Sequence, residues 1–153
     1  AAFSRSTLLE KRRYVPAQWA HGPNWQTYSE YGDRVLGLQA VQKLEGIDSE
    51  VALIPLIGHT RGHSGIAVKY KERWLLHAGD AYFFHGQIES PPRCPSALRL
   101  FQRLIAMDNQ SRIENLQRLQ ELKQEYGEQV HVFSAHDPFE FDNLIMRTNN
   151  EAG

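Results

Sequence analysis

Three short apolar segments of this chain each end a few residues before a side chain that can bind a metal ion. The segments and the side chains that follow them are residues 51–57 with His59, residues 74–78 with Asp80, and residues 130–133 with His136. Short apolar runs that are bounded by turn-forming residues indicate β-strands. We therefore expect the three side chains to stand at strand ends and to converge on one rim of a sheet, where metal sites on sheets tend to be built.

The loops around these side chains have a characteristic order and spacing. The sequence Gly-His-Thr-Arg-Gly-His starts at Gly58, Ala-Gly-Asp ends at Asp80, and His136 follows the last apolar segment. These loops resemble three of the metal-binding loops of the metallo-β-lactamase-fold hydrolases, and the resemblance covers the chain from about Leu36 onward. It implies an α/β fold, namely the C-terminal part of a metallo-β-lactamase-type α/β/β/α sandwich. It also implies that His59 binds the first metal ion, that Asp80 bridges both ions, and that His136 belongs to the second.

One part of the family pattern, an upstream His-x-His-x-Asp-His loop, has no counterpart in this chain. The seven histidines lie at positions 21, 59, 63, 77, 85, 131 and 136, and no two of them are two residues apart. We therefore expect residues 1–153 to be the C-terminal portion of a single metallo-β-lactamase-fold domain, with the missing N-terminal half as its partner. The intact protein should hold two divalent metal ions, with zinc as the expected identity. This chain alone should bind metal weakly or not at all, because each missing donor must be replaced by water.

The residue types at these positions suit metal chemistry, since neutral imidazole and carboxylate are ligands that zinc accepts. The resemblance gives Asp80 a catalytic role, because a bridging carboxylate sets the spacing of two ions that activate one hydroxide. His63 is expected to orient its loop, as Gly62 and the lack of a glutamate argue against a helical zinc motif. Tyr82 and His85 follow Asp80 closely enough to bind substrate by hydrogen bonds, and ordinary loop packing is an equal alternative.

Composition excludes several other classes of partner. Seventeen basic and eighteen acidic residues give a net charge of −1, so the chain lacks the basic field of a nucleic-acid-binding protein. The longest apolar run, residues 51–57, is far too short to span a membrane. The single cysteine excludes an internal disulfide and fits a reducing compartment, so we expect a cytoplasmic location.

The remaining sequence predicts helices and strands around these loops. A helix is expected over residues 6–14, a loop carrying Trp19 and Trp25 over residues 16–25, and strands over residues 35–41 and 65–70. Further helices are expected with Ser96 and Asp108 as N-caps and with Pro138 at a helix start, and Gly127 should lie just beyond a helix end. Asp137 either supports the ligand His136 or caps the helix that follows it, and the cap is favoured. His77 lies within a strand and should be a core or sheet-face histidine whose ring nitrogens have hydrogen-bond partners. The two tryptophans either form a pocket wall or anchor their loop on the core, and the second alternative is favoured.

These features give one leading hypothesis and one rival. The leading hypothesis is that the intact protein is a metal-dependent hydrolase that cleaves a small ester, thioester or lactone through a metal-activated hydroxide. The rival is a non-catalytic fragment or degenerate domain with a packing or partner-binding role, which the missing histidine loop favours. Reaction class rests on the resemblance, because one fold hosts many activities.

Overall fold

The centre of the protein, as seen in a computed structural model that describes residues 7–28, 34–39, 46 and 50–150, is a four-stranded sheet. Its strands, in spatial order, are β3 (Val51–Pro55), β4 (Ser64–Tyr70), β5 (Arg73–His77) and β6 (Val130–Phe133). β4 runs antiparallel to both β3 and β5, whereas β6 runs parallel to β5. As a result β3, β5 and β6 all point the same way, and the loops that follow them meet at one end of the sheet.

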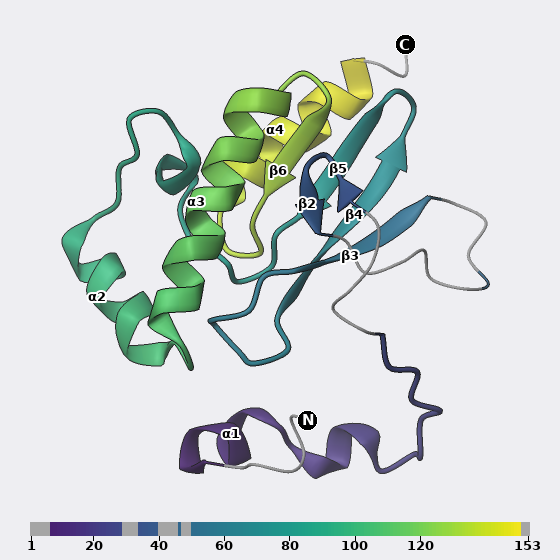
Figure 1. Ribbon diagram of the computed structural model, residues 1–153, viewed down its shortest axis with the longest axis vertical. Helices are drawn as coiled ribbons and strands as arrows, with labels where there is room; N and C mark the ends of the chain where they lie inside the picture. Colours follow the sequence, from purple (N-terminus) through teal and green to yellow (C-terminus); the bar gives the residue numbers. More distant parts are fainter. Residues whose placement is uncertain (1–6, 29–33, 40–45, 47–49, 151–153) are drawn as a thin grey trace.

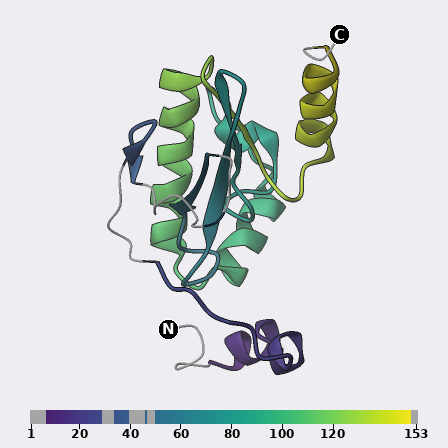
Figure 2. The ribbon, with the colours of Figure 1, turned by 90° about the vertical axis from the view of Figure 1, so that its right-hand side faces the viewer.

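Helices lie on both sides of this sheet (Figures 1 and 2). The long helix α3 (Asn109–Tyr126) covers one face, and α4 (Pro138–Asn150) lies on the other side beside β6. The strands alternate side chains between faces. Those that point toward α3 form the core with Leu119 and Leu122, and they are Ala52, Ile54, Ala67, Leu76, Val130 and Val132. The expected α/β class is thus confirmed.

The opposite face of the sheet is apolar but only partly covered. One row of paired residues across it runs Leu53, Ile66, His77 and Phe133, and Ile66 is 44% exposed. His77 lies on this face, as expected, with its ring 5.1 Å from that of Phe133. None of the helices in the described ranges combines the length and apolar character needed to cross a membrane.

Several helix boundaries follow from local capping. Asp108 accepts a hydrogen bond from the Ser111 backbone N–H at the start of α3, and Asp137 accepts one from Phe139 at the start of α4, so both expected caps are confirmed. Helix α2 (Ser96–Ile105) corrects the sequence prediction, because Pro95 and not Ser96 is its N-cap. The Pro95 carbonyl already accepts the first helical hydrogen bond, from Arg99 N at 3.0 Å, which leaves Ser96 inside the helix.

Two further expectations need correction. Residues 35–39 do not form one strand, because β1 (Arg34–Val35) and β2 (Leu38–Gln39) are joined by a tight turn with positive φ of 51° at Leu36 and 76° at Gly37. Residues 40 and 41 lie outside the described residues. Gly127 ends α3 in a right-handed conformation with φ of −57°, so it does not act as a left-handed cap.

The N-terminal elements are short. Helix α1 (Leu8–Arg13) begins with a capping box in which Thr7 and Glu10 satisfy each other's backbone N–H groups. The expected loop over residues 16–25 contains a 3₁₀ turn, η1 (Pro16–Trp19), and the Trp19 ring meets that of Trp25 edge-on at 6.0 Å. Whether this pair lines a pocket stays a prediction.

Candidate metal centre

The structure brings His59, Asp80 and His136 together at the end of the sheet where β3, β5 and β6 finish. Asp80 lies between the two histidines. Its Oδ1 is 2.9 Å from His136 Nε2, and its Oδ2 is 3.3 Å from His59 Nε2. Each carboxylate oxygen therefore faces a different imidazole.

A glycine with positive φ stands directly before two of these side chains. Gly58 has a φ of 137° and Gly79 has a φ of 56°, and residues other than glycine rarely adopt such backbone conformations. Space is equally restrictive, because a Cβ at Gly58 would lie 2.4 Å from Arg112 N and one at Gly79 would lie 2.7 Å from His63 Nε2. The two glycines let the backbone turn sharply against its neighbours and direct His59 and Asp80 toward each other.

His63 orients the Asp80 loop, in agreement with its expected role. Its Nε2 accepts a hydrogen bond from Asp80 N at 2.9 Å, and its Nδ1 lies 2.8 Å from the carbonyl oxygen of Leu56. Because a backbone N–H can only donate and a carbonyl can only accept, His63 must carry its proton on Nδ1. Burial lowers the pKa of His63, which favours this neutral form.

Helix α1 holds the His59 loop from the other side. The Arg13 guanidinium donates from Nη1 to the carbonyl oxygen of His59 and from Nη2 to that of Ile105, both at 2.7 Å. Arg61, two residues after His59, donates to Glu10 of the same helix at 2.7 Å. The backbone of a candidate ligand is thus fixed to α1 and to the last residue of α2.

Phe83 forms an apolar wall between the two histidines. Its ring lies edge-on to His136 at 4.8 Å and to His59 at 5.9 Å, and 6.3 Å from the ring of Phe101 on α2. Burial lowers the pKa of His59, and the Arg13 cation acts in the same direction against the opposing influence of Asp80. Neutral imidazole is the form that can bind a metal ion.

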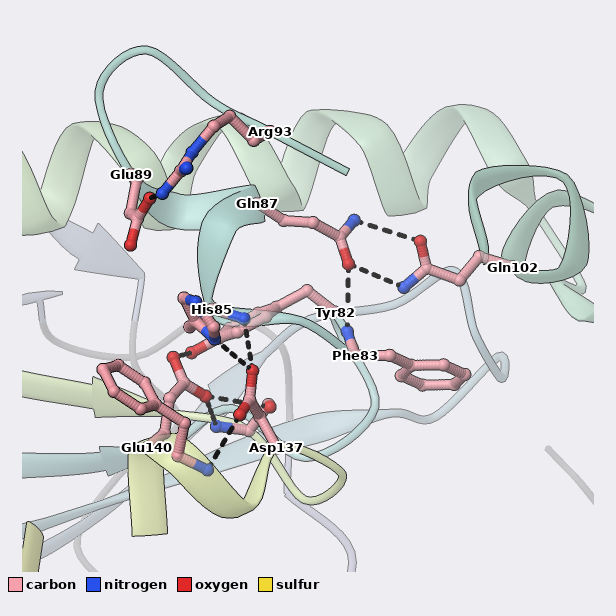
Figure 3. A network of polar contacts seen from close by, with 11 residues as sticks. Tyr82, Phe83, His85, Gln87, Glu89, Arg93, Gln102, Asp137 and Glu140 are labelled. Atoms are coloured by element: carbon pink, nitrogen blue, oxygen red, sulfur yellow. Dashed lines mark hydrogen bonds and ion pairs between the residues drawn. The ribbon is translucent and has the colours of Figure 1, made fainter. Parts of the chain in front are cut away.

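Tyr82 and His85 both contact carboxylates at or just before the start of α4 (Figure 3). Tyr82 is 0% exposed, and its hydroxyl donates to Glu140 Oε1 at 2.8 Å. Burial and the Glu140 carboxylate both raise the pKa of Tyr82, so the phenol stays protonated. His85 turns to Asp137, with Nδ1 2.8 Å and its backbone N 2.6 Å from Oδ2. These contacts give no support to substrate binding by either residue, which stays a prediction.

Three residues that contact this region were not predicted from the sequence. Arg13 is 46 positions from His59, so no local pattern connects them. Phe83 looks like an ordinary apolar residue in its loop. Glu140 accepts hydrogen bonds from Ser134 N and Oγ at 2.8 and 2.9 Å and thereby joins α4 to the loop of His136, yet in sequence it is one acidic residue in a helical first turn.

The donor types suit divalent metal ions, and the distance within each histidine–Asp80 pair is compatible with a shared ion. Two ligands on one tetrahedral zinc, each bonded at about 2.0–2.1 Å, lie about 3.3 Å apart. The His59 to Asp80 and His136 to Asp80 separations of 3.3 and 2.9 Å are close to that value. In the described part of the chain, however, no three or more histidine, cysteine or acidic side chains form a group that could hold a metal ion. The close contacts are pairwise, so further donors would be needed around each ion.

The sequence is similar to two curated proteins, each named "probable metallo-hydrolase", one from Mycobacterium bovis and one from Mycobacterium tuberculosis. Each is 34% identical to the chain over 137 residues, which is 90% of this chain and 44% of the relative. The chain therefore spans less than half the length of these relatives. No family model matches the sequence. The chain is thus related to proteins that carry a metallo-hydrolase name.

Proposed function

We propose that this chain belongs to a metal-dependent hydrolase and forms the C-terminal portion of its metallo-β-lactamase-fold domain. The observation that carries the proposal is the position of Asp80, whose two oxygens face His59 Nε2 and His136 Nε2 separately. A carboxylate placed in this way is suited to bridging two metal ions, each bound by one histidine. The relatives' shared name supports the same class of protein.

The roles of the residues follow from this arrangement. His59, Asp80 and His136 would hold the ions, and His63 keeps Asp80 in place through the backbone bond described above. Bound divalent ions, zinc being the expected identity, supply Lewis acidity and lower the pKa of a water so that it can attack at neutral pH. The Phe83 ring packs edge-on against both imidazoles and gives this side of the proposed site an apolar surface.

The proposed substrate is a small ester, thioester or lactone. This choice rests on the family resemblance together with the balanced charge, since seventeen basic and eighteen acidic residues create no field that would attract a polyanion. The N-terminal half of the same domain is the proposed partner of the open sheet face that carries Ile66, Val68 and Leu75. Covering that face would remove a partly exposed apolar surface from water.

The test uses the full-length protein and measures metal content and turnover together. After removal of metal by a chelator, hydrolysis of p-nitrophenyl acetate, a simple thioester or a γ-lactone should be lost, and added zinc should restore it. A single preferred substrate class would fix the reaction. Turnover that persists in metal-free protein would contradict the proposal.

A second candidate function is a non-catalytic domain with a packing or partner-binding role. The specific observation in its favour is that the described residues supply only one histidine for each oxygen of Asp80, with no group of three or more donors. A full-length protein that binds less than one zinc ion and hydrolyses none of the three substrate classes would support this second function.

A further inference from the structure

A cavity of about 210 Å³ lies between α2, α3 and the loop that precedes α2, apart from the candidate metal centre. It is lined by three arginines, three glutamines and four other residues: Arg93, Arg99, Arg112, Gln87, Gln102, Gln120, Pro92, Cys94, Ile113 and Leu116. One wall is fixed by Gln87 and Gln102, whose side-chain amides exchange two hydrogen bonds of 3.0 Å (Figure 3). The shape of this wall is therefore held by hydrogen bonds between the two glutamines.

The charges around this cavity are unbalanced, because three guanidinium groups and no carboxylate line it. Arg93 forms an ion pair with Glu89, a residue that does not line the cavity. Arg112 is only 6% exposed, and its Nε and Nη2 donate to the neutral Asn109 side chain at 3.2 and 2.9 Å. Among the described residues, neither Arg99 nor Arg112 has an ion pair with a carboxylate.

A buried guanidinium without an anionic partner is energetically unfavourable, because the protein interior replaces the water that would otherwise solvate the charge. Burial accordingly lowers the pKa of Arg112, although an arginine stays protonated at neutral pH. An anion that enters the cavity would supply the missing partner. Ile113, Leu116 and Pro92 give the same space apolar walls.

We propose that this cavity binds a small carboxylate with a short apolar body. Arginine binds carboxylates through two parallel hydrogen bonds, which a planar group entering beside Arg99 and Arg112 can accept. The apolar walls favour a ligand that carries hydrocarbon behind its charge. The volume of about 210 Å³ is below the roughly 300–1,000 Å³ of sites for drug-sized ligands, which limits the ligand to a few carbon atoms. The proposed site is independent of hydrolysis at Asp80.

The test measures binding of hexanoate to the full-length protein by calorimetry, without any turnover. Hexanol, which lacks the charge, and inorganic phosphate, which lacks the hydrocarbon, are the matched probes. A second readout places the ligand, since Cys94 lines the cavity and is partly exposed. Hexanoate should slow the alkylation of Cys94 by iodoacetamide. The extent of alkylation is measured by mass spectrometry of the peptide that contains Cys94.

Three variants make the test specific. Arg112→Met should weaken hexanoate binding about 10-fold or more, because a charge-assisted hydrogen bond is lost. Arg99→Gln should weaken binding in the same direction, and it remains informative if Arg112→Met does not fold, because Arg99 is exposed on the helix surface. Arg103→Gln is the control, since Arg103 is an exposed arginine on the same helix that does not line the cavity.

The expected result is saturable hexanoate binding at least about 10-fold tighter than that of either probe, with Cys94 protected and with binding weakened in the two cavity variants only. Phosphate binding as tight as hexanoate binding would overturn the proposed apolar contact. Equal binding by the Arg99→Gln and Arg103→Gln proteins, or alkylation of Cys94 at an unchanged rate, would overturn the site itself.

Discussion

Replacing Arg13 by alanine should release helix α1 from the loop of His59. The Arg13 guanidinium makes two 2.7 Å hydrogen bonds, to the carbonyl oxygens of His59 and Ile105. A hydrogen bond to a charged group contributes about 1.5–3 kcal/mol, and the lower value applies here because Arg13 is partly exposed. Two such bonds amount to about 3 kcal/mol, which corresponds to a decrease of about 100-fold in the ratio of docked to undocked α1.

Amide hydrogen exchange reports on this ratio, because a helix of six residues is too short to stay folded once it is undocked, and its amides then exchange. The reporters are the amides of Lys11 and Tyr14, which donate to Thr7 and Glu10 within α1. Their exchange should accelerate in Arg13→Ala protein and remain unchanged in Arg12→Ala protein, since Arg12 is exposed. Equal exchange rates in the two variants would refute the assignment of Arg13 as the residue that holds α1 on the His59 loop.

Three other perturbations have defined outcomes. In the full-length protein, Asp80→Ala should abolish hydrolysis with little change in the circular dichroism spectrum, whereas His63→Ala should retain activity that is reduced about 10–100-fold. A larger loss of activity in the His63→Ala protein than in the Asp80→Ala protein would contradict the ligand assignment. The purified 153-residue chain should bind zinc weakly or not at all by titration, and tight binding of two ions would contradict this expectation. Because burial lowers the pKa of His63 below its ordinary 6.5, the unfolded chain binds more protons than the folded one just below pH 6.5. Stability should therefore fall as the pH drops through this window, and urea unfolding of His63→Gln protein should show a smaller fall.

The positions of the candidate ligands at strand ends could be predicted because they depend only on residues that are close together in the sequence. A strand of four to seven residues is visible as an apolar run, and the residue after it must lie at a sheet end. The apolar runs do not determine strand direction, so the expected convergence of the three loops on one rim depended on the family resemblance. β3 and β5 share one direction because β4 is antiparallel to both, and β6 shares it because it pairs parallel to β5, a segment more than fifty residues earlier in the chain.

Two predictions of local structure were wrong because the same residues are compatible with more than one local conformation. Residues 35–39 have strand-forming side chains, yet Gly37 permits the tight turn that divides them into β1 and β2. Ser96 is a good N-cap residue in isolation, but the Pro95 carbonyl already accepts the first helical bond. The burial of Tyr82 was not predicted either, because its hydroxyl donates to Glu140, which lies 58 positions away in the sequence.

The placement of Asp80 shows why such tertiary contacts matter for chemistry. Glycine at position 79 was visible in the sequence, but its necessity comes from His63, whose Nε2 occupies the space that a Cβ would need. The same nitrogen accepts the Asp80 N–H, so one imidazole both excludes a side chain at position 79 and fixes the backbone at position 80. An alanine at position 79 would meet both a left-handed backbone and this close approach, and relief of either would move the Asp80 carboxylate relative to His59 and His136. The geometry of the candidate metal centre therefore depends on the His63 imidazole as well as on the three candidate ligands.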